Sequence, residues 1–347
     1  MRDPQDAAAR LTAEAQHAAA RLTAEAQAAA PRLTAEAQDA AAGLTAGARD
    51  PQDPAARIAA ALGGIGPVLG VDAGGSGTRA ALVIDGVATQ RYSSGPFNFL
   101  LHDDGVPRMA ALALAARPSA VGIGVPGIAR EPGAAAAFAA AISAACGVPT
   151  RVASDATVAW LGAFLGSPGI IVIAGTGSVA IGGSSGALVR IGGHGHLIGD
   201  EGGGYWIGRM ALRAALAAAE GAGPPTELCD ALAQAADASL DELVLRVQRD
   251  PRNRTILAGL SPVVGRCADG PGADPVARTI IAEAASTLAG LASALRQRLG
   301  ELPVAGVGGV FAMPPLWAAF QRSTAAVAPM APPEIGAALL AAGQEAG

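Results

Sequence analysis

Lysine is absent from this chain of 347 residues, and all 24 of its basic residues are arginine. A Walker A phosphate-binding loop requires a lysine that reaches the β- and γ-phosphates, so this class of nucleotide-binding protein is excluded. If the protein binds a nucleotide, then glycine turns, arginine and a metal ion must hold the phosphates.

Cysteine, strong net charge and long apolar runs are also lacking. Cys146, Cys229 and Cys267 stand far apart, so neither a disulfide framework nor a cysteine-based zinc or iron–sulfur site is predicted. A net charge of −5 indicates neither a nucleic-acid footprint nor attraction to an anionic membrane. No segment is long and apolar enough for a membrane span, and the N-terminus shows no apolar leader. We therefore expect a cytoplasmic protein without a nucleic-acid or membrane partner.

Hydrophobic residues make up 51% of the chain, which is far too many for a disordered protein. The length allows about two domains with sizeable cores. Apolar strands alternate with Ala-rich helical segments, which predicts an α/β architecture. We expect an Ala-rich repeat tail and linker over residues 1–65, an N-terminal lobe over 66–167 and a C-terminal lobe over 168–347.

Residues 1–57 carry a repeat with a period of eleven. The segment 10–16 recurs twice, and the pattern decays near Leu44. Eleven residues at 3.67 per turn keep the leucines on one helical stripe, but the stripe is thin and Pro31 interrupts it. The repeat is either an oligomerising or partner-binding arm, or a tandem duplication with marginal helicity and no role.

The central motif occupies residues 68–83. An apolar strand reaches Asp72, four small residues turn the chain, and a second apolar strand leaves from Arg79. The glycines of the turn let backbone N–H groups face an anion. The glycine spacing of the turn also fits a dinucleotide-binding fingerprint, but that fingerprint must be followed by a helix. Here Asp85-Gly86 instead indicates a type I′ turn between two strands. A nicotinamide-type Rossmann unit is therefore disfavoured.

The same pattern of strand, glycine turn and strand returns over residues 170–181, around Gly175-Thr-Gly-Ser178. One such loop could be a plain tight turn. Two of them, about a hundred residues apart, suggest two lobes that each offer a phosphate-holding hairpin to a shared cleft.

Asp155 stands where a strand over 151–153 gives way to a helix over 156–165. It can be simply the N-cap of that helix. Alternatively, the carboxyl ends of strands in α/β sheets open onto the ligand crevice, where a carboxylate can take a proton from a substrate hydroxyl.

Residues 192–208 combine many glycines with two acids and two histidines, which indicates backbone that a ligand approaches closely. On a strand, His194 and His196 would share one face, but a zinc site needs more ligands than this pair. Asn98 lies in a Gly/Pro loop and is either an Asx-turn residue or a contact to a substrate hydroxyl. Helices are further predicted over 109–116, 134–145, 275–299, 316–322 and 334–342, with two more between 225 and 249 and a strand over 302–307 that leads to Gly308-Gly309.

In this order and spacing the motifs resemble the N-acetylglucosamine kinase family. That family is grouped with the BadF/BadG/BcrA/BcrD-type ATPases in the actin-like sugar kinase superfamily. The resemblance covers about residues 66–342, and it rests on 70–76, 154–156, 175–178, 199–207 and 308–309. It implies a two-lobed actin-like ATPase (ribonuclease H-like) α/β fold with a cleft between the lobes, beside an Ala-rich N-terminal helical or disordered tail.

The resemblance also implies a sugar kinase that uses ATP and Mg²⁺ to form the 6-phosphate of N-acetylglucosamine or glucosamine. Asp155 would be the base on the sugar hydroxyl, and Asp72 would lie near the metal. The phosphates would contact Asp72, Gly74, Gly75, Ser76, Gly77, Gly175, Thr176 and Gly177, and the adenosine would contact Gly308 and Gly309. The sugar would contact Asn98, Asp155, Ser178, Val179, Gly193, His194, Gly195, His196 and Asp200.

Two departures from the family pattern matter. Ala73 and Ser76 replace the more usual Gly and Thr, which are small changes. His194 stands where the sugar kinases generally have tryptophan, and this leaves the identity of the sugar open. Nucleotide preference and the existence of a homodimer also stay open.

Two other functions compete with the kinase. An ATPase that activates a partner enzyme resembles this fold but carries an iron–sulfur cluster on cysteines, and the three scattered cysteines argue against it. A non-catalytic sugar sensor could keep the cleft and use the tail for assembly, but the retained acids Asp72 and Asp155 argue against that.

Overall fold

The computed structural model describes residues 53–75, 77–97, 99, 104–131, 133–184 and 186–343. The chain divides into two units. Unit 1 contains the residues up to Ser167, a short piece around residue 186 and the segment from Met330 onward; unit 2 contains 168–184 and 188–329. Residues 1–52 of the tail repeat expected from the sequence lie outside the described residues.

Unit 1 is built on a five-stranded sheet with the order β3-β2-β1-β4-β5. β1, β2 and β3 form an antiparallel meander, and β4 and β5 run parallel to β1. Asp85 and Gly86 both have positive φ, so the type I′ turn predicted between β2 and β3 is confirmed. The strands are β1 (Val68–Ala73), β2 (Thr78–Ile84), β3 (Val87–Ser94), β4 (Ala120–Val125) and β5 (Thr150–Ser154).

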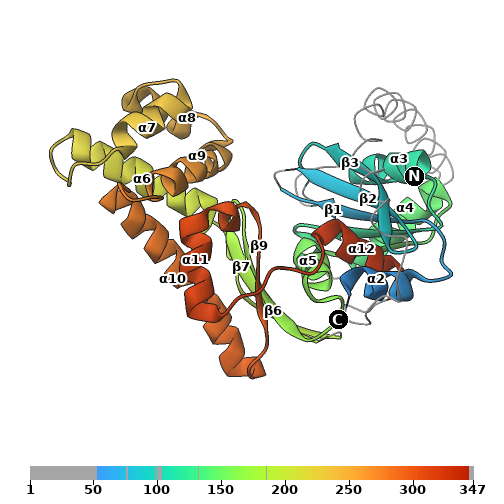
Figure 1. Cartoon of the computed structure of the whole chain (residues 1–347). Coiled ribbons are helices and arrows are strands. Elements are labelled where there is room, and N and C mark those ends of the chain that lie inside the picture. Colours follow the sequence, from blue (N-terminus) through green and yellow to red (C-terminus); the bar gives the residue numbers. More distant parts are fainter. Residues whose placement is uncertain are drawn as a thin grey trace. The chain divides into compact units, whose positions relative to one another are not determined.

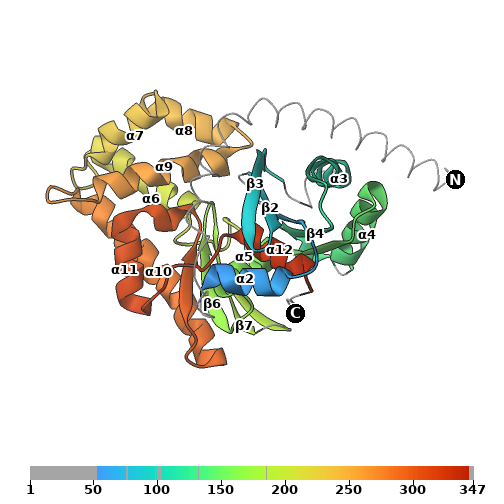
Figure 2. The same cartoon turned by 45° about the vertical axis from the view of Figure 1, so that its right-hand side comes forward.

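Helices cover both faces of this sheet (Figure 2). On one face, α3 (Gly105–Ala116) and α4 (Ala134–Cys146) pack on alternate apolar residues of β1 and β4. On the other face lie α5 (Asp155–Phe164) and α12 (Pro333–Ala341). The strands meet these helices through glycines: a Cβ built on Gly122 would lie 1.8 Å from a carbonyl of α12, and one on Gly124 would lie 2.1 Å from Val158 of α5.

The C-terminal helix therefore belongs to the N-terminal fold, and Figure 1 shows the red α12 among the blue and green elements of unit 1. The sequence-based division placed all of 168–347 in the second lobe. The structure differs because the apolar helix α12 is buried along almost its whole length against α5 and β1.

Unit 1 also begins earlier than expected. Helix α2 (Pro54–Leu62) has Asp53 as its N-cap and buries Ile58 and Leu62, which stand four residues apart. Arg57 on the same helix donates to the carbonyl of Leu165 at 3.2 Å and to the Ser167 hydroxyl at 2.9 Å. Residues 54–62 were expected to belong to the tail and linker, but they form part of a packed unit.

Unit 2 contains a four-stranded sheet with the order β8-β7-β6-β9. β6 pairs with β7 antiparallel and with β9 parallel. The strands are β6 (Gly169–Ala174), β7 (Ser178–Ser184), β8 (Ala187–Gly192) and β9 (Val304–Val307), and the helices are α6 (Gly204–Ala219), α7 (Leu228–Ala236), α8 (Leu240–Arg249), α9 (Asn253–Cys267), α10 (Pro275–Leu299) and α11 (Pro314–Thr324).

Helix α9 was not expected from the sequence, because Pro262 lies inside it. Proline leaves the carbonyl four residues earlier, that of Ala258, without its backbone donor. The Ser261 hydroxyl donates to this carbonyl at 2.7 Å, so the helix continues through the proline. None of the helices in the described part of the chain has the length and apolar character to cross a bilayer.

Candidate active site

The first glycine turn joins β1 to β2 in unit 1. The Gly74 N–H donates to the Gly77 carbonyl at 2.9 Å, and the Phe97 N–H donates to the Gly74 carbonyl at 3.0 Å. The Phe97 ring is fully buried, so it anchors the chain that supports the turn. Ser76, predicted to contact phosphate, lies outside the described residues.

Asp72 pairs with Arg79 across the hairpin and with Gly124 on β4. Only 7% of Asp72 is exposed, and its Oδ2 lies 3.4 Å from Nη2 of Arg79. Burial raises the pKa of Asp72 from its usual 3.8 to about 6; Arg79 lowers it, while the charges of Asp155 and Glu334 raise it further. A buried carboxyl with such a pKa is typical of a functional site.

Asp155 follows the carboxyl end of β5 and is the first residue of α5. The cap of this helix is Ser154, whose hydroxyl accepts from the Thr157 N–H at 3.0 Å. The sequence left open whether Asp155 is merely an N-cap, and the structure gives that task to its neighbour. Oδ1 of Asp155 accepts from the following N–H of Ala156 at 2.9 Å, and the side chain is partly exposed.

Asp72 and Asp155 lie at the same edge of the sheet in unit 1. β1, β4 and β5 are parallel, so their carboxyl ends meet at one edge. The charge of Asp155 contributes to the raised pKa of Asp72, in line with their position at one edge of the sheet. Two acids that were predicted from separate motifs therefore stand at the same edge of the sheet.

The second glycine turn joins β6 to β7 in unit 2. The Gly175 N–H donates to the Gly177 carbonyl at 3.0 Å. The first N–H groups of α6, from Gly204 and Tyr205, donate to the carbonyls of Gly175 and Thr176 at 2.8 and 2.9 Å. The N-terminus of α6 therefore holds the turn in place through two backbone hydrogen bonds.

The turn at Gly308 lies directly against the second glycine turn. β6 and β9 are parallel, so both strands end at the same edge. Gly308 has a φ of 112°, and a Cβ at this position would lie 2.4 Å from the Ala174 carbonyl oxygen. The structure thus brings together the two segments of unit 2 that were predicted to hold the nucleotide.

Two of these glycines are not required by the fold. Neither Gly175 nor Gly309 has a positive φ, and a Cβ on either would meet no atom within 4 Å. Their small size leaves open space beside the chain, which is what close approach of a ligand requires. Gly308, by contrast, is required by its backbone conformation and its neighbour.

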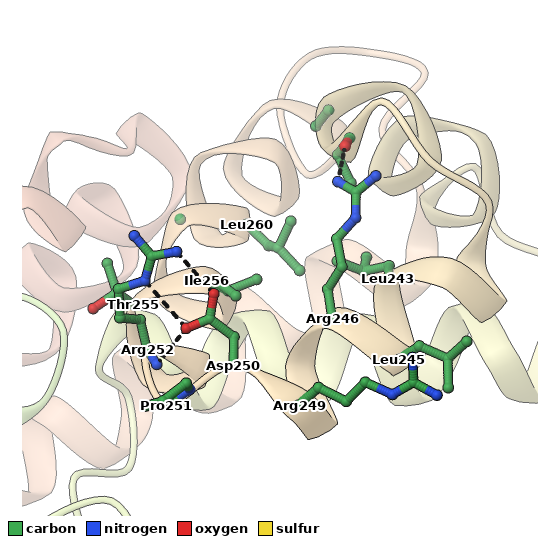
Figure 3. A pocket seen from close by; sticks show the side chains of 13 residues that line it. Leu243, Leu245, Arg246, Arg249, Asp250, Pro251, Arg252, Thr255, Ile256 and Leu260 are labelled. Atoms are coloured by element: carbon green, nitrogen blue, oxygen red, sulfur yellow. Dashed lines mark hydrogen bonds and ion pairs between the residues drawn. The ribbon is translucent and has the colours of Figure 1, made fainter.

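A cavity of about 250 Å³ lies next to this turn, between α9 and the start of α11. Gly309 and Met313 line one side, and Pro262, Gly265 and Arg266 line the other. A larger cavity of about 1050 Å³ lies between α7, α8 and α9, and Figure 3 shows its lining. It contains none of the predicted site residues, so the smaller cavity is the one connected with the glycine turns.

The segment 192–203, here called the histidine loop, follows β8. His194 and His196 lie beyond the strand, so the alternation that would place them on one face does not apply. His196 packs edge-on against Tyr205 with ring centroids 4.9 Å apart, whereas His194 is exposed. No group of three histidine, cysteine or acidic side chains among the described residues could hold a metal ion.

The histidine loop is tied to β7 and to helix α9. The Ser178 hydroxyl donates to the Glu201 carbonyl at 2.7 Å, and Gly193 lies so close to Val179 that an added Cβ would come within 3.0 Å. Asp200 is buried and bonded to Arg254. Ser178, Val179, Gly193, Gly195 and Asp200 are thus brought together in unit 2, Asp155 lies in unit 1, and Asn98 lies outside the described residues.

Sequence reasoning missed Arg254 and Glu334. Glu334 is buried in unit 1, is paired with Arg91 at 2.9 Å and acts on the pKa of Asp72. Arg254 lies on the helix that was not predicted. Its place in the first turn, where the helix dipole disfavours positive charge, would have been a signal only once that helix was recognised.

Several known proteins are similar to this chain in sequence. A curated N-acetylmuramic acid/N-acetylglucosamine kinase from Clostridium acetobutylicum is 38% identical over 139 residues, which cover 40% of this chain and 45% of the relative. A glucosamine kinase from Vibrio cholerae is 38% identical over 91 residues, covering 26% of this chain and 31% of the relative. The matched segments therefore span less than half of either relative.

A solved structure from Chromobacterium violaceum, of a candidate N-acetylglucosamine kinase, superposes with a TM-score of 0.66 at 27% identity. The match covers 79% of this chain and 98% of that protein, so the predicted α/β fold of the actin-like sugar kinases is confirmed. The model of the BadF/BadG/BcrA/BcrD ATPase family matches residues 69–341, which is most of the chain and includes both glycine turns, Asp155 and the turn at Gly308. The chain belongs to the BadF/BadG/BcrA/BcrD ATPase family.

Proposed function

We propose that this protein is a sugar kinase that transfers a phosphoryl group from ATP to the 6-hydroxyl of N-acetylglucosamine or glucosamine. Use of ATP follows from membership in a family of ATPases. The curated relatives are kinases of amino sugars, which supports the class of acceptor. The observation that carries the proposal is the position of Asp155 after the carboxyl end of β5, at the same sheet edge as the buried Asp72, with Ser154 as the helix cap.

Asp155 is assigned the role of general base. Its partly exposed carboxylate at the end of β5 can accept the proton of a sugar hydroxyl as that oxygen attacks phosphorus. Phosphoryl transfer needs mainly positioning of the reactants and neutralisation of charge. One well-placed carboxylate in unit 1 is therefore enough to act as the base.

Asp72 is assigned to Mg²⁺. Its carboxylate is enclosed, its pKa is raised to about 6 by burial, and an exposed arginine is its paired cation. A divalent cation prefers carboxylate oxygens and would offset the desolvation that raises this pKa, so the residue fits the metal. When bound, Mg²⁺ supplies neutralisation of the phosphate charge.

Unit 2 is assigned the nucleotide. The turn at Gly175-Thr176-Gly177 would hold phosphate oxygens, because its open side leaves room for them and backbone N–H groups bind anions. The cavity beside Gly309 would take the nucleoside, with Met313 and Pro262 as apolar contacts and the Arg266 guanidinium at its rim. A chain without lysine would in this way bind ATP through backbone, metal and arginine.

The test is an assay of ADP release over a panel of hexoses, hexosamines and N-acetylhexosamines, with Mg²⁺ and ATP. We expect release that depends on an amino sugar or an N-acetylamino sugar. Equal release without sugar would contradict the kinase and support an ATPase that activates a partner enzyme. Calorimetric sugar binding without any ADP release would instead identify a sugar sensor.

A further inference from the structure

Asp200 is bonded both within its own histidine loop and to helix α9 of unit 2. Only 6% of this residue is exposed, and its backbone has a φ of 66°, which places it in the left-handed region. Oδ1 accepts from the Gly195 N–H at 3.2 Å, within the histidine loop. Oδ2 accepts from Nη2 of Arg254 at 3.0 Å, on helix α9.

This ion pair lies directly against the second glycine turn. A Cβ built on Gly177 would lie 2.1 Å from Oδ2 of Asp200 and 2.8 Å from Nη2 of Arg254. Gly177 is therefore glycine because the ion pair occupies the space that a side chain would need. The carboxylate and the guanidinium together fill the space between the turn, the histidine loop and α9.

Arg254 occupies a position that local rules disfavour. It stands in the first turn of α9, where the helix dipole opposes a positive charge. Its Nε is buried and has no hydrogen-bond partner, which adds a cost of desolvation. Violations of this kind are expected at functional sites, where another gain compensates for them.

We propose that Arg254 is a positioning residue, which through Asp200 holds the histidine loop against the phosphate-holding turn. The proposal rests on the kinase function above, because the histidine loop carries the residues assigned to the amino sugar and the turn carries those assigned to ATP. Without the pair, the Ser178–Glu201 hydrogen bond still joins the loop to the end of the turn, but the contact through Asp200 among the loop, the turn and helix α9 is lost. The expected defect is weaker sugar binding with smaller effects on ATP.

The pair also predicts an order of severity among variants. In Arg254→Gln the Asp200 carboxylate stays buried without its cation, which costs more than removing both charges. The double variant Asp200→Asn with Arg254→Gln should therefore be closer to wild type than Arg254→Gln alone in stability and in hydrogen exchange of the loop. Arg254→Lys keeps the charge without the planar fork and should be intermediate.

Arg252 offers a matched control. It stands two residues before Arg254, at the N-cap of the same helix, and Figure 3 shows its guanidinium paired with Asp250. This pair, 2.9 Å between Nη2 and Oδ2, has an arginine side chain that is 81% exposed. Arg252→Gln removes the same charge from the same helix end without touching the turn or the histidine loop.

The experiment compares hydrogen exchange in peptides from 193–203, measured without substrates, and KM and kcat for the amino sugar. We expect Arg254→Gln to speed exchange in the loop at least tenfold and to raise the sugar KM at least tenfold. Arg254→Lys should lie between it and wild type in both measurements, and the double variant should do so in the exchange measurement. Arg252→Gln should match wild type in both measurements.

If Arg254→Gln matches Arg252→Gln in both hydrogen exchange and sugar KM, the proposal is overturned. A raised sugar KM with unchanged exchange also overturns it, because Arg254 would then contact a substrate directly. The exchange measurement needs no activity, so it decides the role of Arg254 even if wild type phosphorylates no sugar and the kinase function fails. If Arg254→Gln does not fold, Arg254→Lys and the double variant carry the comparison.

Discussion

The guanidinium of Arg79 lies 3.4 Å from the carboxylate of Asp72, yet the pKa of Asp72 is raised to about 6. Arg79 is largely exposed to water, which weakens its attraction, whereas the acid it faces is enclosed. Burial therefore outweighs the ion pair, and the neighbouring acids add to its effect. Ionised Asp72 therefore destabilises the folded protein, and a bound cation would offset this effect.

Asp72→Asn should stabilise the metal-free protein while abolishing activity. The pKa of Asp72 in the folded protein, about 6, lies above the unfolded value near 3.8. Asp72 therefore contributes fully to the stability of the wild type below pH 3.8, and this contribution is lost as the pH rises through 6. At pH 7.5 the variant should gain about 1–3 kcal/mol, and the gain should vanish toward pH 4. Thermal unfolding across pH measures this. A variant less stable than wild type at pH 7.5 would show that the Arg79 attraction dominates.

Asp155→Asn should lower kcat by about 10²–10⁴ while leaving the binding of ATP intact, since only the proton acceptor is lost. Ser154→Ala is the matched control, because it removes the observed helix cap next to the same position. It should cost about 1 kcal/mol of stability with little change in kcat. Turnover of Asp155→Asn near that of wild type would show that Asp155 is not the base.

Alanine substitutions at Gly175 and at Gly308 should have different effects, the first on activity and the second on stability. Gly175→Ala should fold with a normal Tm, because nothing lies within 4 Å of the new Cβ, but should lose at least tenfold in kcat/KM for ATP. Gly308→Ala should lower the Tm by several degrees, since its φ and the Ala174 carbonyl oppose a side chain. Gly290→Ala, inside α10 with open space around it, should change neither activity nor folding adversely. Equal activity of Gly175→Ala and wild type would remove the turn from the ATP site.

Much of the fold could be predicted because its signals are local. Two hairpins, the strand before Asp155 and most helices are visible as apolar runs ended by glycine or proline. Helix α9 was missed because Pro262 is a helix breaker unless a neighbour such as Ser261 satisfies the freed carbonyl. The return of α12 to unit 1 depends on packing against glycines of distant strands, which no local pattern contains.

The residues of the candidate site likewise divide into those that local motifs reveal and those that depend on distant contacts. Asp72, Asp155 and the glycine turns stand in motifs and were found from the sequence. The raised pKa of Asp72 could not be predicted, because it arises from burial and from charges far away in the chain, such as that of Glu334. The partnership of Asp200 with Arg254 spans 54 positions and includes the unpredicted helix.

Truncations should place the functional start of the chain near Asp53. Deleting residues 1–52 should leave activity and Tm nearly unchanged, because the repeat offers few apolar residues for docking. Deleting 1–62 removes α2 and exposes the surface that covers Ile58 and Leu62, each worth about 1.5–3 kcal/mol on burial. Thermal unfolding and gel filtration measure both. A loss of several degrees, or a changed oligomeric state, in the shorter deletion would show that the repeat has a role.

The last prediction concerns His194, which stands exposed in the histidine loop. The family resemblance implies a tryptophan at this position in sugar kinases of this type. An indole offers a larger apolar wall than an imidazole, and at roughly 25 cal/mol per Å² a loss of about 40 Å² of contact costs about 1 kcal/mol. That loss would weaken the preference for an N-acetyl methyl group several-fold. A neutral imidazole also offers a hydrogen-bonding group to a free amine or hydroxyl.

We therefore expect wild type to discriminate poorly between N-acetylglucosamine and glucosamine, or to prefer the free amine, and His194→Trp to shift the preference toward the acetylated sugar. The measurement is kcat/KM for both sugars in both proteins. His196→Phe is a useful companion, because His196 already packs on Tyr205 and its substitution tests the loop without adding an apolar wall at residue 194. If wild type already favours the acetylated sugar about a thousandfold, a margin of about 4 kcal/mol, and His194→Trp changes nothing, then His194 faces away from the sugar and does not set specificity.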